Sequence, residues 1–215
     1  MDWLSDAGIT IKGTETISEI GKLFANNYQN KSTIIWEIIW INLCDSSELF
    51  SWYINNFHFD NNYSRTELDT LLYDSYPQCT KPVRENIIKA FLNTFKESPL
   101  GSTIPACIPM IKGKNVASIS RCPHNELSMV AAAYSLYQYA EKKKRYSLTV
   151  SDFYDDNQRE GIYRQFGIDR ELFEKLLLSI QEEKNHVLRV ELNMGLDNII
   201  LREDLTSVDV LKLML

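Results

Sequence analysis

The segment 157–203 constrains the fold of this chain most, because its apolar pattern changes there from a helical period to a strand period. Residues 158–166 are apolar at helical spacing and run into Gly167, whose freedom at positive φ suits the end of a helix. Asp169 then offers a side chain that can cap a second helix. The apolar residues of that second helix recur at offsets of 0, 1, 4, 5 and 8, which fits a period of 3.6 residues: Leu172, Phe173, Leu176, Leu177 and Ile180.

Two strand-like runs follow the second helix. They cover residues 187–192 and 198–202, and residues 194–197 join them. Two helices across a tight turn, followed by a hairpin, predict a winged helix-turn-helix over residues 151–215. This architecture often places its second helix in a groove of DNA.

The charge of the chain argues against broad DNA affinity. Lys and Arg side chains neutralise phosphates, so a non-specific DNA binder is usually basic. This chain carries a net charge of −6, and segment 157–203 has seven basic and nine acidic residues, a balance of −2. Several acidic residues fall on the expected solvent face of the second helix: Glu171, Glu174, Glu182 and Glu183. DNA and protein therefore both stay open as partners of this segment.

Helical signals dominate the rest of the chain, so we expect a mainly α fold, a helical bundle with winged helix-turn-helix elements and short β-hairpins. The 215 residues can form one or two domains. We expect residues 1–30 to be the remnant of an N-terminal winged-helix-like element, and residues 31–150 to be a helical middle domain with a small hairpin. Because the first residues have the pattern of a helix end, we also expect the chain to be a fragment or a shortened relative of a longer protein.

Neither a secretory leader nor a membrane span is predicted. The first residues lack a basic stretch followed by an apolar one, and the longest apolar-rich run, 34–44, is shorter than the roughly 20 residues that cross a bilayer. The four cysteines are scattered, without the spacing of a disulfide framework. We therefore expect a cytoplasmic protein with no membrane partner.

Basic residues in the second half of the chain are the candidates for DNA contact. The densest basic run closes a predicted helix that starts near residue 125: Lys142, Lys143, Lys144 and Arg145. It can bind a phosphate backbone, or it can interact with the negative end of the helix dipole and remain in solvent. Arg164, Arg170 and Lys175 complete the predicted set of backbone contacts within the winged segment.

A candidate for chemistry lies in the polar loop that holds His58 and Asp60. An imidazole and a carboxylate this close can serve as a general base and a ligand of Mg²⁺, which a nuclease would need. An ordinary polar loop is the competing interpretation. No other metal site is predicted, because the cysteines and histidines match no common zinc spacing. Glu37 lies in the most apolar helix, and we expect an Arg from a neighbouring helix to pair with it.

Several stretches together carry a resemblance to a known family. They are residues 3–9, 16–24, 35–43 and 52–53, followed near the C-terminus by 163–168, 196–199 and 209–211. The chain resembles a bacterial domain-of-unknown-function family whose genes lie beside PAPS-reductase-like genes in DNA phosphorothioation and phage-defence clusters. Its best-described type is the SspB-like DNA-nicking component.

The resemblance implies a DNA-acting component that binds, and in that family type nicks, duplex DNA for sulfur-transfer partners. PAPS-reductase-like and ATPase proteins are the implied protein partners, and Mg²⁺ is the implied cofactor if the chain is a nuclease. The alternatives are a non-catalytic winged-helix adaptor, which binds proteins, and a transcriptional regulator, which would be a homodimer. The sequence leaves the enzyme question open.

Overall fold

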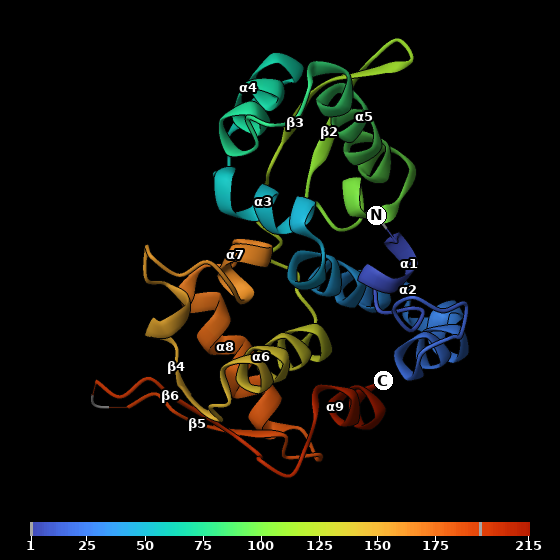
Figure 1. Ribbon diagram of the computed structural model, residues 1–215. Coiled ribbons are helices and arrows are strands. Elements are labelled where there is room, and N and C mark those ends of the chain that lie inside the picture. Colours follow the sequence, from blue (N-terminus) through green and yellow to red (C-terminus); the bar gives the residue numbers. More distant parts are fainter. Residues whose placement is uncertain (1, 194) are drawn as a thin grey trace.

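The computed structural model describes residues 2–193 and 195–215 and is mainly α, with two small antiparallel sheets of three strands each (Figure 1). The chain opens with α1 (Trp3–Asp6) and α2 (Glu19–Ser46), and a single bridge pairs Thr10 with Ile17 between them. The cap of α2 is Ser18, which accepts a hydrogen bond from the backbone N–H of Gly21. The backbone leaves helical geometry at Lys31, where α2 is kinked.

A middle unit, residues 48–120, follows α2. Its elements are α3 (Glu48–Asn56), β1 (Asn62–Ser64), α4 (Arg65–Ser75), α5 (Lys81–Glu97), the short 3₁₀ helix η1 (Pro99–Gly101), β2 (Ile108–Lys112) and β3 (Asn115–Ser120). The strands lie in the order β1-β3-β2, with β3 antiparallel to both neighbours.

A C-terminal unit, residues 129–201, comes next. Its elements are α6 (Met129–Lys143), β4 (Ser147–Thr149), the 3₁₀ helix η2 (Ser151–Phe153), α7 (Ile162–Phe166), α8 (Arg170–Glu182), β5 (Leu188–Glu191) and β6 (Asn198–Leu201). The strands lie in the order β4-β6-β5, again antiparallel throughout. The last helix, α9 (Ser207–Met214), packs against α6 and α2.

The two units repeat one topology. Each runs helix, strand, helix, helix, strand, strand, and in each sheet the last strand lies between the other two. The residues themselves show no matching period, so the repeat lies in the topology alone. The predicted domain boundaries at 30 and 150 remain a prediction, and the repeated order begins at residues 48 and 129 instead.

The local signals of the C-terminal segment are confirmed. Gly167 ends α7 in the left-handed region at a φ of 66°, and the Asp169 carboxylate caps α8 by accepting from the Leu172 N–H at 2.8 Å. The predicted strands appear as β5 and β6, and the small hairpin of the middle unit appears as β2 and β3. Mainly α with short hairpins is therefore the observed class.

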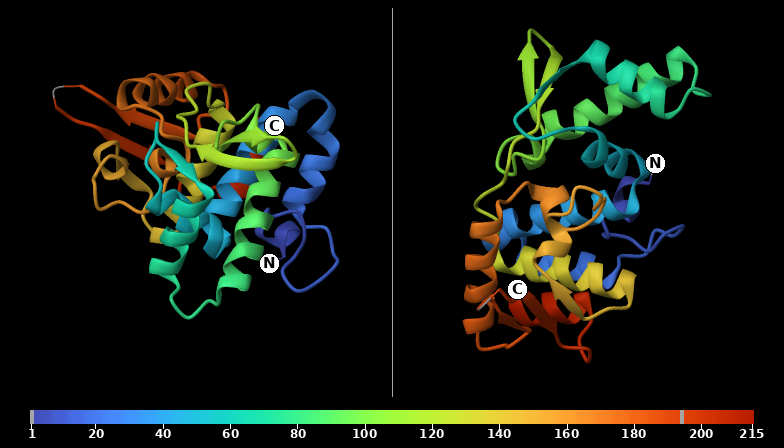
Figure 2. Two further views of the ribbon diagram at one scale, coloured as in Figure 1. Left: turned by 90° about the horizontal axis from the view of Figure 1, so that it is seen from above. Right: turned by 90° about the vertical axis from the view of Figure 1, so that its left-hand side faces the viewer.

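The second half of α2 lies between the two units, as two views of the molecule show (Figures 1 and 2). From Ile35 to Cys44 it is buried on all sides except at Trp36, which is half-buried. Trp40 packs edge-on against Phe50 of the middle unit, and its indole N–H donates to the Gln165 carbonyl of the C-terminal unit at 2.8 Å. No helix among residues 2–193 and 195–215 is long and apolar enough to cross a membrane.

A buried arginine also joins the two units. Arg121 is 1% exposed, and its guanidinium donates to the carbonyls of Ile54 and Phe57 at the end of α3 and of Arg164 in α7. Its charge faces the ring of Phe59 at 3.9 Å. Because carbonyls at helix C-termini carry partial negative charge, they stabilise this cation although burial lowers its pKa.

We expect Arg121→Met to destabilise the protein by about 2–5 kcal/mol, because three carbonyls would lose their charged donor. Urea denaturation measures this change. Arg159→Met is the matched control: Arg159 is exposed, and its substitution should change stability by less than about 0.5 kcal/mol. Equal midpoints for the two variants would contradict the role of Arg121.

Candidate nucleic-acid interface

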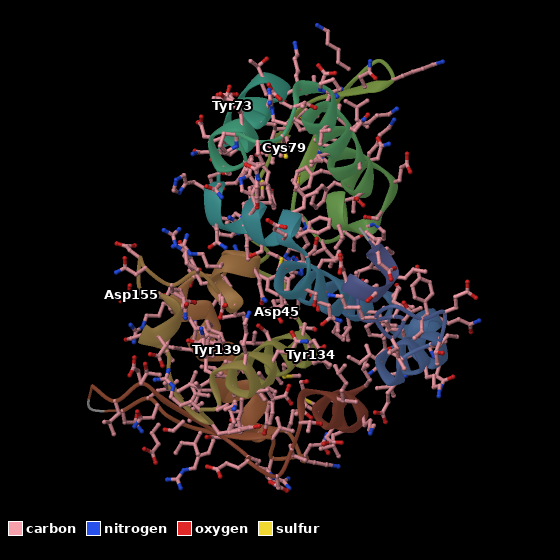
Figure 3. All side chains as sticks on the ribbon, viewed as in Figure 1. Asp45, Tyr73, Cys79, Tyr134, Tyr139 and Asp155 are labelled. Atoms are coloured by element: carbon pink, nitrogen blue, oxygen red, sulfur yellow. The ribbon has the colours of Figure 1, made fainter. Side chains whose placement is uncertain are left out.

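The structure pairs the start of the predicted basic run with carboxylates. Lys142 at the end of α6 lies 2.7 Å from Asp45 and 2.9 Å from Glu160, and Lys143 contacts Glu160 at 2.9 Å. Asp45 is labelled in Figure 3, between the two units. Burial of the Glu160 carboxyl opposes ionisation, but hydrogen bonds from Lys143 and Lys142 outweigh it and lower the pKa of Glu160. A phosphate would have to compete with these ion pairs.

The last two residues of the run differ: Arg145 forms an ion pair, and Lys144 is exposed to solvent. Arg145 lies 2.5 Å from the Asp152 carboxylate. Lys144 ends α6 in the left-handed region at a φ of 52°, is exposed, and forms no ion pair within the described part of the chain. It is therefore the one member of the run that those residues leave available for a phosphate.

The predicted contacts in the winged segment are also engaged. Arg164 donates to the backbone carbonyls of Gln158 at 2.6 Å and Asp156 at 2.9 Å. These bonds hold the loop before α7, so Arg164 has a structural use. As a DNA contact it stays a prediction.

Arg170 and Lys175 on α8 pair with acids of their own unit. Arg170 lies 2.8 Å from Glu174 and 3.2 Å from Asp197, and Lys175 lies 2.6 Å from Glu171. The hydrogen bond to Glu174 raises the pKa of Arg170. The acidic residues noted in the sequence thus neutralise the cations expected to contact DNA.

His58 and Asp60 are not brought into a metal-binding cluster. The His58 backbone N–H donates to the Tyr63 hydroxyl at 2.9 Å. Asp60 has a positive φ of 62°, and its N–H donates to the Arg121 carbonyl at 2.7 Å. Among residues 2–193 and 195–215, no three His, Cys, Asp or Glu side chains gather as they would around a metal ion. The two residues shape a turn that covers Arg121.

The prediction that an Arg pairs with Glu37 is wrong. The buried carboxylate contacts His124 Nε2 at 2.8 Å and accepts from the Ser128 hydroxyl at 2.5 Å and the Ser128 N–H at 3.2 Å. The carboxylate lies between the serine and the histidine, so the imidazole is not placed to take the hydroxyl proton as a nucleophilic triad requires. Since Ser128 caps α6, Glu37 instead stabilises the positive end of that helix.

A different surface, on α5, carries polar residues that form no ion pair within residues 2–193 and 195–215. The inner face of α5 buries Ile88, Phe91, Leu92 and Phe95. Its outer face carries residues at offsets of 0, 3, 7 and 10, which align along one side of a helix: Asn86, Lys89, Asn93 and Lys96. We call these four the α5 stripe. Asn93 is half-buried and the other three are exposed.

The β2–β3 turn extends the same surface. Lys112 ends β2 and Lys114 lies in the turn, both are exposed, and the Lys96 ammonium donates to the Lys114 carbonyl at 3.0 Å. Residues 81–120 contain six basic and two acidic residues, a balance of +4 in a chain of net charge −6. In the described ranges, none of Lys89, Lys96, Lys112 and Lys114 pairs with a carboxylate. Nitrogen-tipped side chains surround this end of the molecule in Figure 3.

The inner side of α5 is fixed by a second buried arginine. Arg84 donates to both oxygens of Asp69 on α4, at 2.8 and 3.2 Å, and to the Cys79 carbonyl at 2.8 Å. Its guanidinium also lies over the Tyr73 ring at 4.9 Å; Tyr73 and Cys79 are labelled in Figure 3. This bidentate pair sets the position of α5 against α4.

The equivalent helix of the C-terminal unit has a different outer face. Along α8 the positions at offsets of 0, 4, 7 and 11 are Glu171, Lys175, Leu178 and Glu182. The first two form an ion pair, and Leu178 is 45% exposed. The α5 stripe is thus polar and cationic, with the exposed Glu97 one turn after Asn93, whereas the α8 face is acidic and partly apolar.

Sequence reasoning missed the α5 stripe, although its signal was present. The apolar residues of 81–95 recur at helical spacing, and the same period places Asn86, Lys89, Asn93 and Lys96 away from them. What the sequence does not reveal is that α5 holds the same place in its unit as α8 does in its own, since that equivalence lies in the topology.

Comparison with known proteins adds no assignment. The sequence matches no known protein-family model, and no curated protein or solved structure matches it significantly. The resemblance to the phosphorothioation-associated family therefore stays a prediction.

We expect the Arg84–Asp69 pair to make stability depend on pH in the acid range. The hydrogen bond from Arg84 lowers the pKa of Asp69, so its stabilising effect is full above the ordinary Asp pKa of about 4 and is lost as pH falls through the lower folded value. Asp69→Asn should therefore lower the melting temperature at pH 7 and flatten its dependence on pH between about 5 and 3. Thermal denaturation across this range measures the effect, and Asp74→Asn on the same helix is the control. Parallel pH profiles for the two variants would show that the pair is not coupled to folding.

Proposed function

We propose that the two units are tandem winged helices and that the middle unit binds duplex DNA. Their shared order of helix, strand, helix, helix, strand, strand supports the first part, since the third helix and the final hairpin would be recognition helix and wing. The corresponding elements are α5 with the β2–β3 turn, and α8 with the β5–β6 hairpin.

One observation carries the choice of the middle unit. Its recognition helix and wing present cations that no carboxylate of the described chain neutralises, whereas the cations of the C-terminal unit are mostly paired. Unpaired Lys side chains release counterions from DNA when they bind phosphates, and this supplies most of the affinity. A helix such as α5 fits the major groove, which is about 12 Å wide.

The biological setting of this DNA binding is supported only by the family resemblance. We propose that it serves a DNA phosphorothioation and defence system beside PAPS-reductase-like sulfur-transfer and ATPase partners. We propose binding, and not nicking, as the activity of this chain. The residues that carry the proposal are amides and ammonium groups, which hold DNA but do not cleave it.

A second function, protein docking, is supported for the C-terminal unit. The outer face of α8 presents Glu171, Glu182 and the exposed Leu178 at the position where a winged helix would otherwise contact DNA. Acidic side chains there repel phosphates and suit a protein surface. The adaptor and DNA-binding roles would then belong to different units of one chain.

The test is affinity for a short duplex DNA at about 50 and 200 mM salt. We expect binding that weakens steeply with salt, and we expect the triple variant K96Q/K112Q/K114Q to reduce the slope by about 3, close to 0.9 for each lost phosphate contact. The control K142Q/K143Q/K175Q removes the same charge from ion-paired residues and should leave the slope nearly unchanged.

Two outcomes would contradict the proposal. If the wild-type chain does not bind at 50 mM salt, DNA binding fails altogether. If the control triple loses affinity and the middle-unit triple does not, the contact surface is the one first predicted from the sequence, on the C-terminal unit.

A further inference from the structure

We propose that α5 reads base sequence and does not merely grip the backbone. In this assignment Asn86 and Asn93 each pair with an adenine and Lys89 pairs with a guanine, within about four successive base pairs. The inference rests on the DNA binding proposed above for the middle unit. It adds the class of DNA that would be bound, a sequence-specific site with a purine-rich strand.

Amide and ammonium side chains alternate along the α5 stripe. The Asn amide N–H donates to adenine N7 while its carbonyl oxygen accepts from the adenine N6 amino group, and Lys donates to the O6 and N7 acceptors of guanine in the major groove. Asn86 and Lys89 are exposed and Asn93 is half-buried, so all three side chains reach the outer side of α5. A surface that bound only phosphates would need no amides.

The two asparagines have no structural use in the described chain. Three other helical asparagines donate to the carbonyl four residues earlier: Asn27 to Leu23, Asn55 to Ser51 and Asn56 to Trp52, whereas Asn26 and Asn30 of α2 make no such bond in the described residues. Within residues 2–193 and 195–215, the side chains of Asn86 and Asn93 make no such bond. Asn is a poor helix former, so an amide left free in the middle of a helix adds nothing to folding.

The spacing of the α5 stripe fits successive bases. Asn86, Lys89 and Asn93 are three and four residues apart, so the outer two are separated by about 10 Å along the helix at 1.5 Å per residue. Three base-pair steps of 3.4 Å cover about the same length. Zinc-finger helices use similar intervals of four and three residues to contact three successive bases.

The helix is held firmly enough for base contacts, which need an accurate position. The Arg84–Asp69 pair fixes its first half against α4, and the Lys96–Lys114 hydrogen bond fixes its end against the wing. Lys96 follows Asn93 by about one turn of α5 and contacts the wing at Lys114, so these cations continue the stripe past the three readout residues, where we place the backbone phosphates. Phosphate contacts set the register in which the stripe meets the bases.

The test is selection from a library of duplex DNA with a random central segment, followed by sequencing. We expect an enriched core in which two adenines flank a guanine on one strand. Asn86→Ala and Asn93→Ala should each lower the preference at one position by about tenfold and leave the salt slope unchanged, because neither side chain is charged. Asn27→Ala, a helical asparagine of α2, is the matched control and should keep the full preference.

The outcomes separate this inference from the function on which it rests. Binding without an enriched core, or a core that both Asn variants retain, would overturn sequence reading while leaving DNA binding intact. No binding by the wild-type chain would overturn both. An enriched core that weakens at one position in each Asn variant, with the salt slope preserved, would establish base readout by α5.

Discussion

The burial of α2 on nearly all sides is the constraint on which the rest of the structure depends. A helix enclosed in this way must find partners for every polar group that it carries, since an unpaired buried group costs about 1–3 kcal/mol. Glu37 is satisfied by His124 and Ser128 before α6, and Trp40 by the Gln165 carbonyl of α7. The aromatic face of Trp40 packs in the middle unit. These contacts fix the positions of both units relative to α2.

Two buried arginines fix the positions of further elements of the two units. Arg121 connects α3 and α7 and has no carboxylate partner among the described residues, so carbonyl dipoles and the Phe59 ring stabilise its charge. Arg84 acts within the middle unit and positions α5 through Asp69. The outer face of α5 is therefore held rigid by contacts on its inner face. The proposed interface lies on this outer face, where the helix is held in a defined position.

One topology carries two unlike surfaces. α5 and α8 hold equivalent places in their units, yet the α5 stripe offers free amides and ammonium groups while α8 offers glutamates and an exposed leucine. The two helices pack in equivalent positions, but the glutamates and ion pairs of α8 disfavour phosphate. The functions proposed for the two helices therefore differ. A net charge of −6 averages over this difference and obscures it.

The sequence by itself determined the local elements. Helical periodicity, the left-handed stop at Gly167 and the Asp169 cap placed α8 and its neighbouring strands, because these signals act within a few residues. Only the tertiary structure decided which cations are free. Lys142 and Arg170 meet carboxylates such as Asp45 and Asp197 that are 97 and 27 residues distant, and no local pattern predicts such pairs. The repeated topology was hidden for the same reason, since strand order is set by long-range pairing and not by residue period.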